Sequence, residues 1–244
     1  MLRENNTLLN NKVRLASILS NLSTIHSQEQ INSSFKKAIL NSSHLSCDSR
    51  EIIENSTFIA IKGETYNGHA FIPKLLATNC LIIADEKENE ILAKKIKEKS
   101  HQLKPNCQKA KIIFVKDTKA FATKYASVFY DHPSRQLKVV GITGTNGKTT
   151  SAYFLKHLYQ EIGLSTGLIG TIEISYGDKC LVNPNTTPEP VKLQRHLFEM
   201  KAAGVEVVIM EISSHALALN RVDGLHLDSV IFTNITQDLS LIHI

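Results

Sequence analysis

One ten-residue segment, Gly-Ile-Thr-Gly-Thr-Asn-Gly-Lys-Thr-Thr at positions 141–150, constrains the fold of this chain more than any other feature. An apolar stretch at 137–142 runs into it, and a helical pattern over about 149–162 follows it. Strand, glycine loop and helix in this order are the context of a phosphate-binding loop. Gly144 and Gly147 allow backbone N–H groups to turn toward phosphate oxygens, and the helix N-terminus adds partial positive charge.

The loop supplies candidates for ATP binding and catalysis. Lys148 is expected to reach the β- and γ-phosphates as a catalytic residue, and the Thr149 hydroxyl to bind Mg²⁺. The general pattern has a glycine five residues before Gly147, where this chain has Ile142. The alternative is a plain glycine turn between a strand and a helix. The predicted ATP-binding residues are Gly144, Thr145, Asn146, Gly147, Lys148, Thr149 and Thr150.

A second candidate for metal binding and catalysis is Glu211, which ends the apolar stretch at 205–210. A carboxylate at the carboxyl end of a buried parallel strand faces the ligand crevice of an α/β sheet. There it can hold Mg²⁺ opposite Thr149 and neutralise charge on a transferring phosphate. The alternative is a solvated charge at the end of a strand.

The rest of the chain alternates strands with helices, which predicts an α/β fold. We expect a small N-terminal α/β domain at 1–136, then an incomplete P-loop-type domain with a mostly parallel sheet at 137–238, separated by the turn-rich segment 131–135. The predicted strands lie at 57–61, 80–84, 111–115, 137–142, 168–175, 205–210 and 229–234. The predicted helices lie at 69–77, 89–99, 149–162 and 188–203, and a stretch at 13–22 is amphipathic.

Composition excludes several classes of function. The net charge of +5 is small and dispersed, which argues against nucleic-acid binding. The four cysteines form no C-x-x-C pair, so neither a zinc site nor a disulfide framework is indicated. No apolar run approaches the roughly 20 residues that cross a bilayer, so we expect no membrane insertion and a cytoplasmic location.

The loop at 143–149, Thr-Gly-Thr-Asn-Gly-Lys-Thr, resembles that of the Mur ligase family, which shares it with folylpolyglutamate synthases. Further segments resemble the branch that adds the third amino acid, diaminopimelate or lysine, to UDP-N-acetylmuramoyl-L-alanyl-D-glutamate. These segments lie at 47–50, 58–63, 185–188, 210–217, 221–222 and 230–234. The resemblance implies ATP-dependent activation of a carboxylate as an acyl phosphate, followed by attack of an amine to form an amide.

The resemblance also implies a set of substrate-binding residues. Asn185, Thr186 and Thr187 would bind the muramoyl-dipeptide, together with Ser213 and Arg221. Ser49 would contact the uridine part, and Glu64, Thr65 and Tyr66 form a loop near it. Thr187 precedes Pro188, so it is also expected to cap the helix at 188–203.

Two other functions stay open at this point. One is a folylpolyglutamate synthase-like ligase, against which the front segments argue. The other is a nucleotide-binding module without catalysis. The residues at 239–244 match nothing in the family pattern, and we expect them to be non-native. In the family that the chain resembles, a C-terminal domain binds the acceptor amino acid. We expect that this chain lacks that domain and is inactive as a ligase by itself. Whether the acceptor is diaminopimelate or lysine stays undecided.

Overall fold

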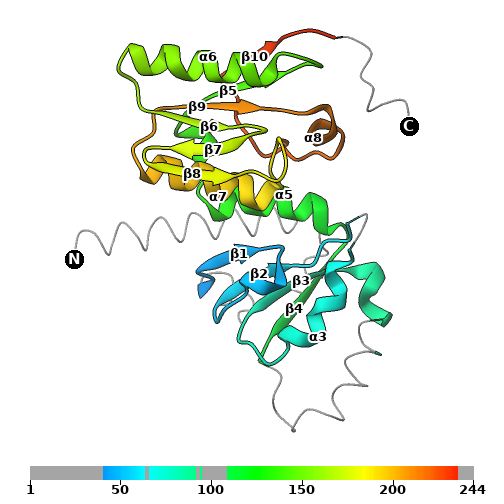
Figure 1. The fold of residues 1–244 in the computed structure, drawn as a ribbon. Coiled ribbons are helices and arrows are strands. Elements are labelled where there is room, and N and C mark those ends of the chain that lie inside the picture. Colours follow the sequence, from blue (N-terminus) through cyan, green and yellow to red (C-terminus); the bar gives the residue numbers. More distant parts are fainter. Residues whose placement is uncertain (1–40, 64–65, 92–93, 95–108, 236–244) are drawn as a thin grey trace, which may run out of the picture. The chain divides into compact units, whose positions relative to one another are not determined.

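The computed structural model describes residues 41–63, 66–91, 94 and 109–235 (Figure 1). The chain divides into two compact units, Met1–Phe129 and Tyr130–Ile244. The amphipathic stretch at 13–22, most of the expected helix at 89–99, Glu64, Thr65 and the tail at 239–244 lie outside the described residues. The domain limits at 136 and 238 stay predictions.

The first unit contains a parallel sheet with the strand order β1-β2-β3-β4. Its strands are β1 (His44–Ser46), β2 (Ser56–Ile59), β3 (Leu81–Asp85) and β4 (Lys111–Val115). The last three confirm predicted strands, whereas β1 is too short to stand out in the sequence. Phe58 and Ile82 lie in a core cluster with residues of the following helices, among them Ile72 and Leu76.

The helices that lie wholly within the described part of the first unit are mostly short. They are η2 (Ser49–Glu51), η3 (Gly68–Phe71), α3 (Ile72–Leu75), η4 (Glu86–Glu88) and α5 (Thr118–Phe129). The single helix predicted at 69–77 is wrong, because this segment is a 3₁₀ turn followed by one α turn. Pro73 has no N–H to bond the carbonyl of His69, and Ile72 N–H bonds that carbonyl instead.

The second unit contains a mixed sheet with the order β10-β5-β9-β6-β7-β8. Its strands are β5 (Lys138–Thr143), β6 (Thr166–Ile169), β7 (Glu173–Tyr176), β8 (Lys179–Val182), β9 (Val207–Glu211) and β10 (Ser229–Phe232). The first four strands of this order are parallel, which confirms the predicted fold class. The single strand predicted at 168–175 is wrong, because the chain reverses at 170–172 and β6 and β7 pair antiparallel.

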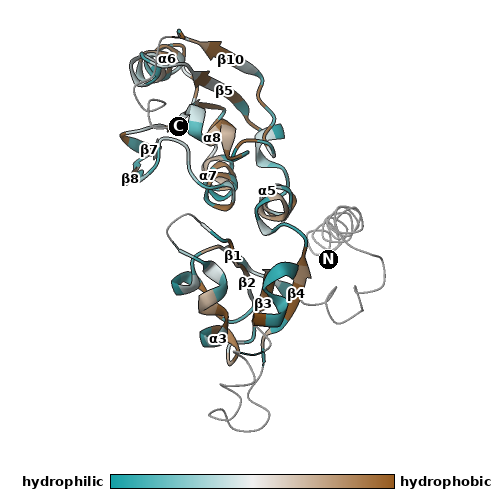
Figure 2. Ribbon diagram, turned by 90° about the vertical axis from the view of Figure 1, so that its right-hand side faces the viewer, coloured by the Kyte–Doolittle hydropathy of each residue, from teal (hydrophilic) through white to brown (hydrophobic). Residues whose placement is uncertain are grey.

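Two helices, α6 (Lys148–Glu161) and α7 (Pro190–Ala202), cover opposite faces of this sheet (Figure 1). Side chains alternate along β9: Val207 and Ile209 lie in the cluster with α6, and Val208 and Met210 in the cluster with α7. Figure 2 shows hydrophobic colouring along β5 and β10. Because successive side chains on a strand point to opposite faces, Glu211 falls on the α6 face.

The predicted cap of α7 is wrong. The helix begins at Pro190, with Glu189 as its N-cap at a ψ of 150°. A residue that precedes proline avoids the α conformation, so Glu189 stays extended and the helix starts two residues later than expected. Thr187 is thereby left outside the helix.

Candidate active site at the carboxyl ends of β5 and β9

The glycine loop has the backbone conformation that its sequence requires. Gly144 has a φ of 130° and Gly147 a φ of 83°, both in the region that favours glycine. Lys148 Nζ lies over the loop and donates to the carbonyl oxygens of Gly144 at 2.6 Å and Thr145 at 3.0 Å. Gly147 is the N-cap of α6 and offers no side-chain cap, so the first N–H groups of this helix suit an anion.

Glu211 and Thr149 meet beside this loop. Ile142 pairs with Glu211 across the parallel strands β5 and β9, so Glu211 ends next to the start of the loop. The Thr149 hydroxyl donates to Glu211 Oε2 at 2.9 Å, and Glu211 is only 1% exposed. The carboxylate is therefore buried and bonded rather than solvated.

Thr171 is a residue at this site that the sequence did not single out. It lies in the reversal between β6 and β7, where its N–H donates to Glu211 Oε1 at 2.9 Å. Its hydroxyl donates to Glu211 Oε2 at 3.1 Å. A Cβ on neighbouring Gly170 would lie 2.5 Å from Glu211 Oε1, so only glycine allows this approach.

Thr233 and Asn234 also contact the loop, although neither was predicted as a site residue. The Asn234 carbonyl accepts from the N–H of Thr145 at 3.1 Å, and its side-chain oxygen accepts from that of Asn146 at 3.1 Å. The Thr233 hydroxyl donates to the Asn146 carbonyl at 2.6 Å. The end of β10 therefore holds the middle of the loop.

The structure places Thr187 close to Ser213 and Arg221. The buried Thr187 hydroxyl donates to the Glu211 carbonyl at 3.0 Å and accepts from Ser213 N–H at 3.1 Å. Arg221 donates to the Thr187 carbonyl at 2.9 Å and pairs with Glu189 at 2.7 Å. Ser213 caps the short helix α8 (Ser214–Ala218) through a bond from Ala216 N–H.

Asn185 and Thr186 lie further out on the same segment. Asn185 is exposed and Thr186 is partly exposed. The Thr186 hydroxyl lies 3.1 Å from that of Thr171, which connects this segment to the surroundings of Glu211. Five of the predicted substrate residues thus lie on the two segments 185–187 and 213–221.

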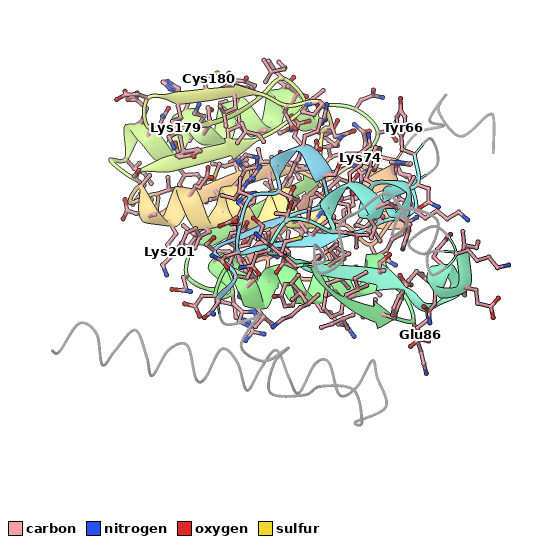
Figure 3. The ribbon with its side chains drawn as sticks, turned by 90° about the horizontal axis from the view of Figure 1, so that it is seen from below. Tyr66, Lys74, Glu86, Lys179, Cys180 and Lys201 are labelled. Carbon is pink, nitrogen blue, oxygen red and sulfur yellow. The ribbon has the colours of Figure 1, made fainter. Side chains whose placement is uncertain are left out.

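The candidates in the first unit are more exposed. Ser49 begins η2, where its hydroxyl has no hydrogen-bond partner among the described residues. Tyr66 is 75% exposed and extends away from the ribbon (Figure 3).

A separate polar cluster lies between α6 and the β7–β8 hairpin. Hydrogen bonds from Ser175 and from Cys180, which Figure 3 labels on β8, lower the pKa of Glu173. Lys156 donates to Ser175 at 2.8 Å. Burial and the nearby Glu173 carboxylate raise the pKa of Tyr153, and the charge of Glu211 contributes last.

Two family models match the chain. Residues 41–130 match a model described as "Mur ligase family, catalytic domain", and residues 142–239 match the "Mur ligase middle domain". Together the two ranges cover more than half of the 244 residues.

This chain belongs to the Mur ligase family.

Two curated proteins similar to this Mur ligase are named UDP-N-acetylmuramoyl-L-alanyl-D-glutamate–2,6-diaminopimelate ligase. The protein from Bacillus velezensis is 38% identical over 191 residues, which are 78% of this chain and 36% of that protein. One from Clostridium acetobutylicum is 40% identical over 195 residues, 80% of this chain and 37% of the relative. The chain therefore spans little more than a third of the length of these relatives.

Two solved structures share the fold. A structure of a UDP-N-acetylmuramoyl-L-alanyl-D-glutamate–2,6-diaminopimelate ligase aligns with a TM-score of 0.58 at 19% identity, over 80% of this chain and 37% of that one. The MurF ligase from Thermotoga maritima in complex with ADP aligns with a TM-score of 0.51 at 20% identity, over 81% and 38%. In the described part of this Mur ligase, no helix is long and apolar enough to cross a bilayer.

The donor set at the loop of this Mur ligase fits Mg²⁺. Thr149 and Glu211 offer a hydroxyl and a carboxylate oxygen, the hard oxygen ligands that Mg²⁺ takes. Among the described residues there is no group of three or more His, Cys, Asp or Glu side chains that could hold a metal ion. Mg²⁺ is usually bound by one or two protein ligands together with waters and substrate phosphates, so the two side chains Thr149 and Glu211 are enough protein ligands for it.

Proposed function

We propose that this chain forms the ATP-binding and substrate-binding part of a MurE ligase. In this proposal the enzyme joins an amino acid to UDP-N-acetylmuramoyl-L-alanyl-D-glutamate in peptidoglycan synthesis. The observation that carries it is the buried Glu211 carboxylate, which accepts from Thr149 beside the phosphate loop. The names of the curated relatives support the substrate and favour 2,6-diaminopimelate over lysine as the acceptor.

ATP binds at the loop 144–150 in this proposal. Lys148 neutralises the β- and γ-phosphates, because its ammonium already lies over the loop on the carbonyls of Gly144 and Thr145. Thr149 and Glu211 would hold Mg²⁺, which, when bound, neutralises charge on the phosphoryl group during transfer. The N-terminus of α6 adds backbone donors for the phosphate oxygens.

The substrate binds along two segments of the second unit and one region of the first. Asn185, Thr186, Thr187 and Ser213 contact the muramoyl-dipeptide. Arg221 binds an anionic group of the muramoyl-dipeptide. Its planar guanidinium, which pairs with Glu189 in the free protein, pairs with that anionic group instead when the substrate is bound. Ser49 and the loop Glu64, Thr65 and Tyr66 contact the uridine part.

The reaction has two steps. The γ-phosphoryl group of ATP passes to a carboxylate of the substrate, giving an acyl phosphate, and ADP leaves. The acceptor amine then attacks the carbonyl carbon, and inorganic phosphate leaves as the amide bond forms. Catalysis by this part of the protein consists of positioning the phosphates and the carboxylate and offsetting their charge. The reaction would take place in the cytoplasm.

Isothermal titration calorimetry of this chain tests the proposal. We expect one site for Mg²⁺ with the non-hydrolysable analogue AMP-PNP, and one site for UDP-N-acetylmuramoyl-L-alanyl-D-glutamate. Failure to bind either ligand would overturn the assignment. In a chain extended to the length of the relatives, ADP release should depend on diaminopimelate, and release with lysine alone would contradict that choice of acceptor.

A further inference from the structure

Thr171 donates a hydrogen bond to each of the two oxygens of the Glu211 carboxylate. Its N–H bonds Oε1 at 2.9 Å and its hydroxyl bonds Oε2 at 3.1 Å. The last torsion of a glutamate side chain is broad, so an unheld carboxylate rotates easily. Two bonds from one residue, one to each oxygen, prevent that rotation.

The hydroxyl of Thr171 has a definite direction. It lies 3.1 Å from Glu211 Oε2 and 3.1 Å from the Thr186 hydroxyl, but it carries only one proton. The carboxylate and the Thr186 hydroxyl are both acceptors within reach of this proton. Because a charged carboxylate is a stronger acceptor than a neutral hydroxyl, the Thr171 proton goes to Glu211.

The turn that carries Thr171 is itself held on two sides. Gly170 lies so close to Glu211 that a Cβ there would be 2.5 Å from Oε1. On the other side, the buried side chain of Asn183 donates to the Gly170 carbonyl at 2.7 Å. The backbone donor of Thr171 is thus fixed before any ligand binds.

We propose that Thr171 is a positioning residue for Glu211, holding the carboxylate with Oε2 turned toward Thr149 for a divalent cation bound with the nucleotide. This inference rests on the proposed function, because it assumes that Mg²⁺ and a nucleotide bind at the loop. Thr171 acts through Glu211, and its contribution should appear in the metal-dependent part of nucleotide binding alone.

Calorimetry on Thr171→Val tests this, with AMP-PNP titrated in Mg²⁺ and separately in EDTA. Valine keeps the shape and the backbone N–H but removes the hydroxyl. Losing one bond to a charged group predicts an affinity about tenfold weaker in Mg²⁺ and nearly unchanged in EDTA. Thr171→Ser, which keeps the hydroxyl, should bind as the wild type does.

Thr166→Val is the matched control. Thr166 begins β6, the strand that leads into the turn of Thr171, and its buried hydroxyl has no hydrogen-bond partner in the described structure. Removing it should leave the affinity for AMP-PNP unchanged in Mg²⁺ and in EDTA. Thermal unfolding of each variant shows whether the fold is kept.

The outcomes separate the two proposals. If the wild type binds AMP-PNP more tightly in Mg²⁺ and Thr171→Val does the same, the positioning role is overturned and the proposed function stands. If Thr171→Val lost affinity for AMP-PNP equally in Mg²⁺ and in EDTA, the positioning role would also be overturned, because a purely structural role gives that result. A wild type that binds no nucleotide would overturn both.

Discussion

The two units of this chain hold their polar residues in different ways. In the second unit, Glu211 is buried and receives hydrogen bonds from Thr149 and Thr171. In the first unit, Tyr66 is largely exposed, and Ser49 has no side-chain hydrogen bond among the described residues. The second unit therefore has a site fixed before ligands arrive, whereas contacts at Ser49 and Tyr66 would form only on binding.

The largest expected effect is that of Lys148→Ala. Removing the ammonium that lies over the loop takes away charge-assisted bonds to the phosphates, so the affinity for Mg²⁺ and AMP-PNP should fall about 100-fold or more. Calorimetry measures this change. Lys138→Ala, at the exposed start of β5, is the control and should bind normally. Normal nucleotide binding by Lys148→Ala would contradict the claim that the second unit holds a site fixed before ligands arrive.

Gly170→Ala should have the next largest effect. The added Cβ would meet Glu211 Oε1 at 2.5 Å, so the carboxylate must move. We expect a loss of about 1–3 kcal/mol in the free energy of unfolding, together with a loss of Mg²⁺-dependent nucleotide binding. Urea unfolding and calorimetry measure the two effects.

Gly167→Ala, on the strand β6 that leads to Gly170, is the matched control. Its Cβ would meet the Met200 sulfur at 2.8 Å, which is part of a flexible side chain. This variant should lose stability but keep its Mg²⁺ dependence. Equal Mg²⁺ dependence in both variants would contradict a site that depends on the exact place of Glu211.

Ser49→Ala tests substrate binding by the first unit and should have a smaller effect on affinity. One neutral hydrogen bond to the nucleotide-sugar is worth about 0.5–1.5 kcal/mol, which corresponds to about two- to tenfold in affinity. Stability and AMP-PNP binding should not change, because the hydroxyl has no partner within the described residues. Ser43→Ala, at an exposed serine of the same unit, is the control. A large loss of stability in Ser49→Ala would show that this residue is structural.

The smallest effect concerns His69, a buried polar residue of the first unit. Its Nδ1 bonds Asn67 Oδ1 at 2.8 Å, and its Nε2 accepts from Asp85 N–H at 2.9 Å. Burial lowers the pKa of His69, and the carboxylates of Glu88 and Asp85 oppose this more weakly. The unfolded chain then binds the proton more readily than the folded chain, so stability falls as the pH drops below about 6.5.

Urea unfolding at pH 7.5 and pH 5.5 measures this loss. His69→Gln cannot titrate, so its stability should depend less on pH than that of the wild type. His196 of the second unit also has a pKa lowered by burial and contributes the same dependence to both proteins. An identical pH dependence in wild type and variant would contradict a role for His69.

Much of the fold followed from patterns within single segments. The apolar runs at 80–84, 111–115 and 205–210 predicted β3, β4 and β9 within a few residues, because buried parallel strands are continuously apolar. The reversal at 170–172 was missed, since apolar and β-branched residues continue through both β6 and β7. The cap of α7 was misplaced, because Pro188 is a valid first residue of a helix and only Pro190 starts one.

The site was predictable where its residues are neighbours in the sequence. The loop 143–149 and its helix were identified from the order of strand, glycine loop and helix, although Ile142 departs from the general glycine spacing. Glu211 was identified from its place at the end of a strand. Thr171 and Asn234 were not identified, because their partners lie 40 and 88 residues away in the sequence. A pattern within one segment does not predict such a hydrogen bond, because the order of the strands brings its two residues together.

The most direct measurement of the central claim compares wild type and Glu211→Gln for AMP-PNP affinity in Mg²⁺ and in EDTA. Glutamine keeps the size of the side chain and an oxygen that can accept from Thr149, but it removes the negative charge. We predict that Mg²⁺ strengthens binding to the wild type at least about tenfold and does little for the variant. Equal strengthening in both proteins would contradict the claim that the second unit holds a Mg²⁺-nucleotide site through Glu211.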